Sequence, residues 1–66
     1  MQYEYLGYRV TVRRAGVWAA IIHPPGSMLS MSEIPTATFE EGEAIFRERV
    51  KVAIEADIAA MKQART

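Results

Sequence analysis

The chain has 66 residues, half of them hydrophobic, and its eight Lys and Arg residues are balanced by eight Asp and Glu residues. A chain of this length forms one domain, residues 1–66, whose core alone is only marginally stabilising. Because the sequence contains no cysteine, disulfides cannot supply the missing stability, and we expect a homodimer. The zero net charge provides no field that attracts polyanions, so it disfavours nucleic acid as a partner.

The N-terminal sequence MQYEYLGYRV has no basic segment followed by an apolar one, and no run of about 18 apolar residues is available to span a membrane. We therefore expect a cytoplasmic protein that does not bind membranes. His, Asp and Glu residues do not cluster at metal-ligand spacing, so the sequence predicts neither a metal nor a cofactor.

Three β-strands are predicted in the first half of the sequence. Residues 5–14 alternate apolar and polar side chains, residues 17–23 (VWAAIIH) are rich in strand-forming residues, and residues 28–34 (MLSMSEI) form a weaker third run after two prolines. In the first strand one face carries Leu6, Tyr8, Val10 and Val12, and the other carries Gly7, Arg9, Thr11 and Arg13.

A long helix is predicted from about residue 39 to about residue 63. Thr38 and Glu41 have the spacing of a capping box, which places the helix start at Phe39. The bases Lys62 and Arg65 near the other end agree with the helix dipole. Apolar residues form two stripes, one of Phe46, Val50, Ala53, Ile54, Ile58 and Met61 and another of Ile45, Val52, Ala56 and Ala59.

These elements predict an α+β fold, in which a three-stranded antiparallel sheet is followed by one long C-terminal α-helix packed on one face. A helix of about 24 residues is about 36 Å long, whereas strands of six or seven residues span only about 20–23 Å. We expect the helix to overhang the sheet with apolar side chains exposed. The alternative is a helix that frays near Ala60.

The loop between the first two strands decides which way Trp18 points. If residues 14–16 form the loop, Val12 pairs with Trp18, and Trp18 faces the core. If the loop is only 15–16, the pairing shifts by one residue and Trp18 lies outside. The first alternative is favoured because the shorter turn would force Ala15 to a positive φ. The outer face of the sheet then carries Arg9, Thr11, Arg13, Val17, Ala19 and Ile21.

The string YRVTVRRAGVWAAII, followed by TFEEGEAIF, resembles the plant ethylene-response-factor DNA-binding domain and its bacterial integrase-arm relatives. Those domains share the tyrosine-arginine start, the glycine-x-tryptophan-alanine-alanine second strand and the threonine-phenylalanine helix opening, and they consist of three strands and a helix. Their sheet lies in the major groove. The resemblance implies that Arg9, Arg13 and Trp18 contact nucleic acid, and Arg14 is a further candidate contact.

The helix start Thr38-Phe39-Glu40-Glu41 and the small sheet with one helix are also similar to the HicB-type antitoxin fold. Proteins of that type bind a toxin and themselves. This second resemblance implies a protein partner together with self-association.

Residue types that carry catalysis are present but isolated. His23 has no cysteine or acidic partner in its strand or loop, and Ser27, Ser30 and Ser32 show no nucleophile-elbow pattern. The helix dipole accounts for the acids Glu40, Glu41 and Glu43. We therefore expect no catalytic residues and no enzyme activity.

The sequence as a whole predicts a non-enzymatic interaction module that associates with itself, either through the outer sheet face or through the C-terminal half of the helix. The candidate contacts on the helix are Val52, Ile54, Ile58 and Met61. The alternative is a nucleic-acid-binding domain that uses the arginine-bearing face of the sheet.

Overall fold

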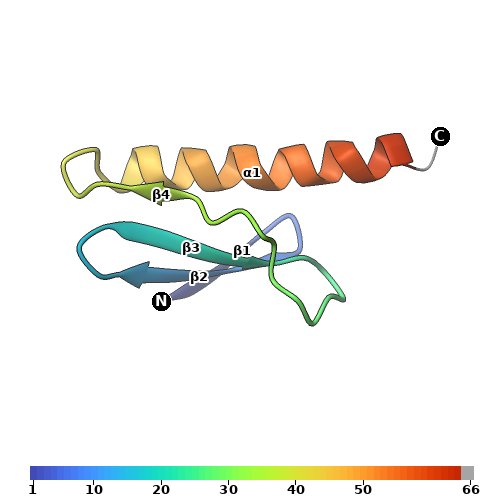
Figure 1. Cartoon of the computed structure of the whole chain (residues 1–66), viewed down its shortest axis with the longest axis horizontal. Coiled ribbons are helices and arrows are strands. Elements are labelled where there is room, and N and C mark those ends of the chain that lie inside the picture. The colour runs from blue at the N-terminus through green and yellow to red at the C-terminus, as the bar shows by residue number, and fades with distance from the viewer. Residues whose placement is uncertain (65–66) are drawn as a thin grey trace.

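The computed structural model of the chain describes residues 1–64, so Arg65, expected near the helix C-terminus, lies outside the described residues. Its elements are β1 (Gln2–Tyr5), β2 (Tyr8–Arg14), β3 (Trp18–His23), β4 (Thr36–Ala37) and α1 (Glu43–Ala64). The four strands pair antiparallel in chain order, and α1 packs across one face of the sheet (Figure 1). This arrangement confirms the α+β fold, with an additional first strand in the sheet.

The prediction of one strand over residues 5–14 was wrong, because a tight turn divides this segment. Leu6 and Gly7 have φ angles of 51° and 84°, and positive φ at both central residues is typical of the two-residue turn that joins β-hairpins. Residues before the turn form β1, in which Tyr3 pairs with Val10 and faces the core. Leu6 therefore lies in an exposed turn rather than on the core face.

The hairpin between β2 and β3 confirms the predicted direction of Trp18 but not the predicted pairing. Residues 15–17 form the loop, and Arg14 pairs with Trp18. Trp18 is displaced by two residues along β2 relative to the favoured pairing with Val12. Because side chains alternate with period two, this displacement leaves Trp18 on the core face.

The predicted third strand over residues 28–34 was also wrong, because this segment is irregular. It still follows the edge of β3: the Met31 amide donates to the Ile22 carbonyl at 2.8 Å, and the Ala20 amide donates to the Pro35 carbonyl at 3.0 Å. Between these bonds, residues 31–35 lie beside the shorter stretch 20–22, so a regular ladder cannot form. Regular pairing is confined to the two residues of β4.

The helix begins at Glu43 rather than at the predicted Phe39. The capping-box bonds exist, since the Thr38 amide donates to Oε1 of Glu41 at 2.9 Å and the Glu41 amide donates to Oγ1 of Thr38 at 3.2 Å. They close a turn before the helix, because Gly42 has a φ of 90° and interrupts helical geometry. At its other end α1 continues to Ala64, beyond the alternative of fraying near Ala60.

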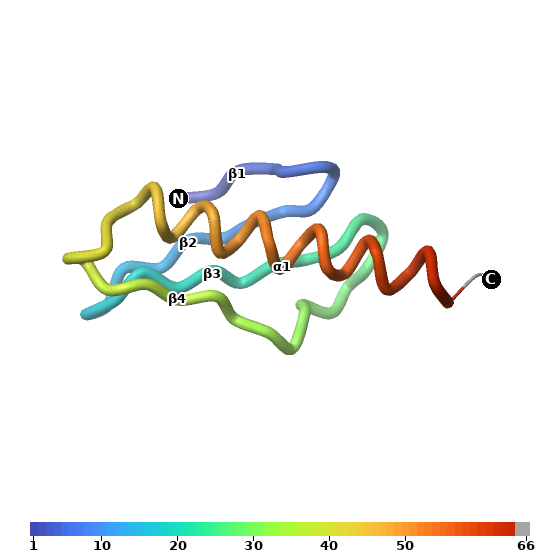
Figure 2. The backbone as a smooth tube through the Cα atoms, turned by 90° about the horizontal axis from the view of Figure 1, so that it is seen from above, coloured from blue at the N-terminus to red at the C-terminus, as the bar shows by residue number. Residues whose placement is uncertain are grey.

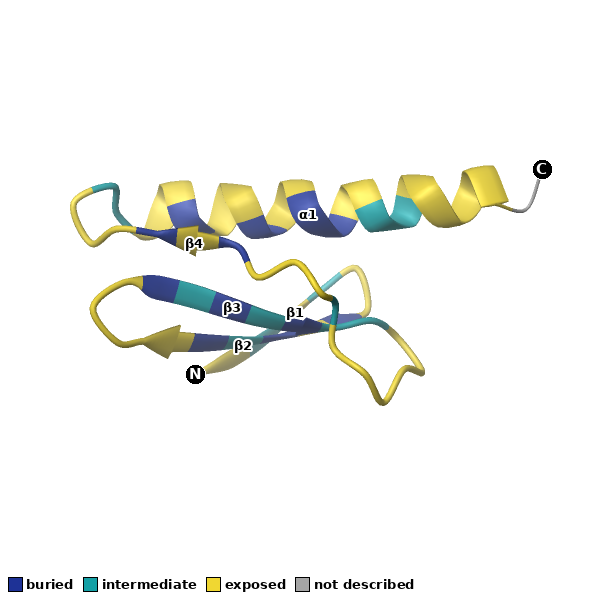
Figure 3. Cartoon of the chain, in the orientation of Figure 1, coloured by how far each residue is buried: buried dark blue, intermediate teal, exposed yellow. Residues whose placement is uncertain are grey.

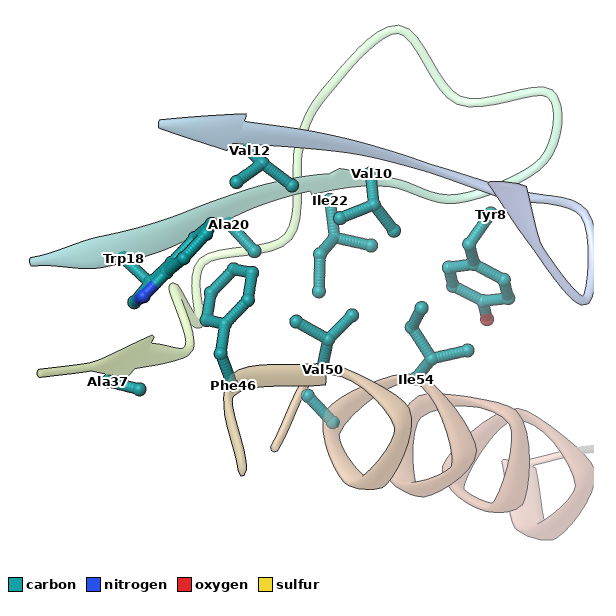
Figure 4. Close-up of a cluster of buried hydrophobic side chains, with 11 residues drawn as sticks. Tyr8, Val10, Val12, Trp18, Ala20, Ile22, Ala37, Phe46, Val50 and Ile54 are labelled. Atoms are coloured by element: carbon teal, nitrogen blue, oxygen red, sulfur yellow. The ribbon is translucent and has the colours of Figure 1, made fainter. Parts of the chain in front are cut away.

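The core lies between α1 and the inner face of the sheet (Figure 4). The Trp18 ring stacks on Phe46 with centroids 5.5 Å apart, and Phe39 meets it edge-on at 5.9 Å. The upper helix face and most of the loop between β3 and β4 are exposed, whereas Pro35 at the end of that loop is buried (Figure 3). The buried hydrophobic residues that form this core are Tyr8, Val10, Val12, Trp18, Ala20, Ile22, Ala37, Phe46, Val50, Ala53 and Ile54.

The C-terminal part of α1 extends past the sheet, as the lengths of the elements predict (Figure 2). With 22 residues, the helix is about 33 Å long, whereas the seven residues of β2 span about 23 Å. At the base of the overhang, Ile58, Met61 and Lys62 line one hollow together with residues of the turn between β1 and β2 and of the loop that follows β3.

Candidate interaction surfaces

The outer sheet face is the side of the sheet that points away from α1. It carries five of the six residues predicted for it, while Val17 lies in the hairpin loop instead. The face is more polar than expected, because β1 adds Gln2 and Glu4, and Gln2 donates a 3.2 Å hydrogen bond to Oγ1 of Thr11. The residues of this face are Gln2, Glu4, Arg9, Thr11, Arg13, Ala19, Ile21, His23 and Thr36.

The four candidate nucleic-acid contacts do not share a face. Trp18 is buried in the core, and the Arg14 guanidinium lies over its ring, 4.6 Å from the centroid. Arg9 and Arg13 project from the opposite side of the sheet. Only this second pair is therefore presented together on an exposed sheet surface.

The overhang surface gathers apolar side chains from three elements at the C-terminal end of α1. Leu6 is 60% exposed and Met61 is 52% exposed, whereas Ile58 is half-buried against the core. With the buried Tyr8, these side chains line an apolar hollow of about 330 Å³. The residues of this surface are Leu6, Pro24, Pro25, Ile58, Met61 and Lys62.

Two tyrosine hydroxyls attach the first hairpin to the helix beside this hollow. Tyr8 donates a 2.5 Å hydrogen bond to Oδ2 of Asp57, and Tyr5 donates a 2.9 Å hydrogen bond to Oε2 of Glu55. Each bond favours the protonated phenol, so it raises the pKa of both tyrosines, that of Tyr8 to about 12. These contacts hold the base of the overhang in a defined position.

The helix residues predicted as contacts are distributed over different surfaces. Ile54 is completely buried in the protein's own core, so it is not available to a partner. Val52 is 59% exposed, but it lies on the other flank of α1 from Ile58. The helix therefore offers two separate apolar surfaces.

The β4 groove lies between α1 and residues 33–35, with a volume of about 420 Å³. Arg49 stands at its end, where it donates a 3.0 Å hydrogen bond to the Thr36 carbonyl and pairs with both carboxylate oxygens of Glu41. This pairing holds the pKa of Glu41 at about 2. The groove is lined by Glu33, Ile34, Pro35, Glu48, Arg49, Val52, Ala53 and Ala56.

Sequence reasoning missed Leu6, Pro24 and Pro25 as surface contacts. The signal for the first was the Leu6-Gly7 pair between two alternating runs, which is a hairpin sign. The core-facing positions change from odd numbers in β1 (Tyr3, Tyr5) to even numbers in β2 (Tyr8, Val10), but the apolar Leu6 extends the even series back into the turn and conceals this change. The groove residues Glu33 and Ile34 carried no signal, because an irregular segment has no periodicity.

No metal-binding cluster is found among residues 1–64. This part of the chain has no group of three or more His, Cys, Asp or Glu residues that could hold a metal ion. His23 is half-buried, and its Nδ1 has no hydrogen-bond partner within the same residues. None of the helices described is long and apolar enough to cross a membrane.

Comparison with known proteins gives no match. No family model matches the sequence, and neither a curated protein nor a solved structure matches the chain.

Proposed function

We propose that this chain is a non-enzymatic interaction module that forms a homodimer through the overhang surface. The observation that carries the proposal is the exposure of Leu6 and Met61 around an apolar hollow at the C-terminal end of α1. Clustered apolar side chains of this kind mark contact sites. A chain of 66 residues also gains stability by burying them against a second copy.

The charges beside the hollow support a two-fold contact. Glu55 and Lys62 flank Ile58 and Ala59 on one face of α1. If two copies cross antiparallel at this point, Glu55 of each helix lies opposite Lys62 of the other. A symmetric dimer therefore forms two ion pairs from one patch, as an isologous interface requires.

The outer sheet face supports self-association less well. Arg9 and Arg13 are exposed there, and neither forms an ion pair among the described residues. A two-fold contact between two such faces brings these like charges together, and only the half-buried Ala19 and Ile21 offer apolar area. Burial of unpaired charge opposes that interface.

Sedimentation of the untagged protein at several concentrations tests the dimer. Leu6→Asn removes an apolar contact without opposing the left-handed backbone at this position, because Asn tolerates positive φ. We expect the wild type to be a dimer and Leu6→Asn to shift it toward the monomer. Leu29→Asn is the matched control, since Leu29 is exposed on a loop outside the hollow.

A charge exchange tests the predicted crossing. Lys62→Glu is expected to weaken the dimer by placing carboxylates opposite each other, and the double variant Glu55→Lys with Lys62→Glu is expected to restore it. A wild type that remains monomeric at all concentrations would refute the proposed dimer. Because Glu55→Lys also removes the hydrogen bond from Tyr5, both variants are compared in a Tyr5→Phe background. Weakening by Lys62→Glu without recovery in the double variant would there refute the antiparallel crossing.

A second candidate function is nucleic-acid binding by the outer sheet face. The specific observation in its favour is that Arg9 and Arg13 are unpaired and lie on the same strand face. Two phosphate contacts predict a shallow salt dependence, with a log–log slope of about −2. Titration of labelled duplex DNA with wild type and with Arg13→Ala tests this, and absence of binding at low salt rejects it.

A further inference from the structure

The β4 groove has an apolar floor and an acidic rim. Val52 is 59% exposed and Ile34 is 53% exposed, and Ala53, Ala56 and Pro35 complete the apolar lining. Glu33 and Glu48 are also part of the lining, and the carboxylate of neither forms an ion pair or a hydrogen bond within the described chain. The only base in the lining, Arg49, is already paired with Glu41. The groove therefore presents two unbalanced negative charges beside exposed apolar side chains.

The neighbouring sheet edge is closed to a partner strand. β4 has only two residues, and its Thr36 carbonyl already accepts a hydrogen bond from Nη1 of Arg49. A peptide that added a strand here would have to displace this contact and the ion pair with Glu41. Recognition in the groove thus depends on side chains rather than on main-chain hydrogen bonds, which is how a helix binds in a groove.

The dimensions of the groove agree with this mode. Its helical wall extends from Glu48 to Ala56, a distance of about 12 Å along α1. This length matches about two turns of a partner helix, which would insert apolar side chains spaced three or four residues apart. We propose that the β4 groove binds a basic amphipathic helix of a partner protein, with its apolar residues on Ile34 and Val52 and its Lys or Arg residues beside Glu33 and Glu48.

A second copy of this chain is a poor occupant of the same groove. In a symmetric contact the groove of one copy faces the groove of the other, so four unpaired carboxylates from Glu33 and Glu48 would meet. Like charges at an interface oppose association. The proposal is therefore independent of the dimer proposed for the overhang surface, because the two surfaces use different residues.

Binding of two synthetic helical peptides tests the proposal. Each has about 18 residues, long enough to form a helix, with leucines on one face; the flanking residues are lysines in the first peptide and glutamates in the second. Fluorescence anisotropy is expected to show binding of the lysine peptide only, weakened by salt. Amide chemical shifts of the labelled protein are expected to change at Ile34 and Val52. Equal affinity for both peptides, no binding of either, or shifts confined to the outer sheet face would overturn the proposal.

Variants of the full chain make the test specific. Val52→Glu is expected to weaken binding of the lysine peptide about tenfold or more, and Glu48→Lys roughly three- to tenfold. Glu40→Lys makes the same charge change on an exposed residue outside the groove, and it is expected to leave the affinity unchanged. Lys62→Glu separates this site from the overhang surface, because it is expected to change the sedimentation behaviour but not the peptide affinity. Circular dichroism verifies that each variant is folded. An equal loss of peptide affinity in Glu48→Lys and Glu40→Lys would also overturn the proposal.

Discussion

The guanidinium of Arg14 lies over the indole ring of Trp18, 4.6 Å from its centroid, because the two residues are direct partners across β2 and β3. Phe39 contacts the same indole edge-on, and its own ring centroid is 5.7 Å from the guanidinium. Arg14 thus closes the open end of the core over the tryptophan. A residue that the sequence suggests as a nucleic-acid contact is instead placed to stabilise the fold.

Replacement of Arg14 by alanine is expected to lower the free energy of unfolding by about 0.5–1 kcal/mol, the usual strength of an exposed cation–π contact. The indole also gains solvent access, so its fluorescence emission is expected to shift to longer wavelength. Urea unfolding followed by fluorescence measures both effects. Arg13→Ala is the matched control, because Arg13 lies on the outer sheet face and a substitution there is expected to change stability by less than about 0.5 kcal/mol. Equal effects of the two variants would contradict the structural role of Arg14.

The hydrogen bond between Tyr8 and Asp57 predicts a loss of stability at alkaline pH. The bond raises the pKa of Tyr8 from 10.0 to about 12 in the folded protein, so folding favours the protonated phenol. The resulting stability is present below pH 10 and disappears between about pH 10 and about pH 12. We expect Tyr8→Phe to be less stable than the wild type by about 1 kcal/mol at neutral pH, and this difference to shrink toward pH 12.

Unfolding by urea at neutral and alkaline pH checks the Tyr8 prediction. Other groups also titrate at high pH, including Tyr5, whose pKa is raised by its bond to Glu55. The difference between the wild type and Tyr8→Phe removes these shared contributions. A difference that stays constant from neutral pH to about pH 12 would show that the bond to Asp57 does not stabilise the folded state.

The direction of Trp18 was predictable from local sequence, whereas its exact partner was not. Side chains alternate between the two faces of a strand, so a shift of the pairing by two residues leaves Trp18 on the same face of the sheet. Pairing with Val12 and pairing with Arg14 therefore both direct Trp18 into the core. Gly16 has a positive φ of 78°, and it belongs to both the predicted loop, 14–16, and the observed loop, 15–17. The glycine therefore does not distinguish between the two pairings. In the observed pairing Trp18 contacts Phe39 and Phe46, which are distant in sequence and which local sequence therefore does not place.

The overhang of α1 was predictable because it follows from the rise per residue of helices and strands. The composition of the overhang surface was not, since Leu6 and Met61 lie 55 positions apart and meet only in the fold. The bond between Tyr8 and Asp57 spans 49 positions in the same way. Periodicity identifies the face of each element, but it does not show which elements adjoin.

The ion pair between Glu41 and Arg49 predicts a loss of stability in acid. The hydrogen bonds from Arg49 and from the Thr38 amide lower the pKa of Glu41 from 4.5 to about 2, so folding favours the charged carboxylate. Its contribution is present above the unfolded pKa and is lost as the pH falls from about 5 to about 2. Glu41→Gln is expected to have a lower urea midpoint than the wild type at pH 7, with the two midpoints converging near pH 2.

The neighbouring variant Glu40→Gln provides the comparison for Glu41, because Glu40 is exposed and forms no ion pair within the described residues. It is expected to have the same acid dependence as the wild type. If Glu41→Gln lost stability in acid to the same extent as the wild type, the loss of stability at low pH would not be due to protonation of the Glu41 carboxylate.

The turn between β1 and β2 depends on the absence of a side chain at Gly7. Gly7 has a φ of 84°, which residues with a side chain rarely adopt, and a β-carbon added at this position would lie 3.2 Å from Cγ of Pro25. Gly26 has a similar φ of 72°, but a β-carbon at that position meets no atom within 4 Å. Substitution of each glycine by alanine therefore separates the cost of the backbone conformation from the cost of the contact.

We expect Gly26→Ala to lower the free energy of unfolding by about 1 kcal/mol, the cost of a left-handed backbone for an L-residue, and Gly7→Ala to lower it by more. Substitution of Gly7 is expected to cost more because the neighbouring Pro25 is a rigid ring, which cannot rotate away as a flexible side chain can. Thermal unfolding at a low protein concentration, where self-association contributes least, measures the two variants on an equal basis. Equal destabilisation would mean that the loop after β3 moves to accommodate the new methyl group, and the packing of Pro25 against the first turn would then contribute little to stability.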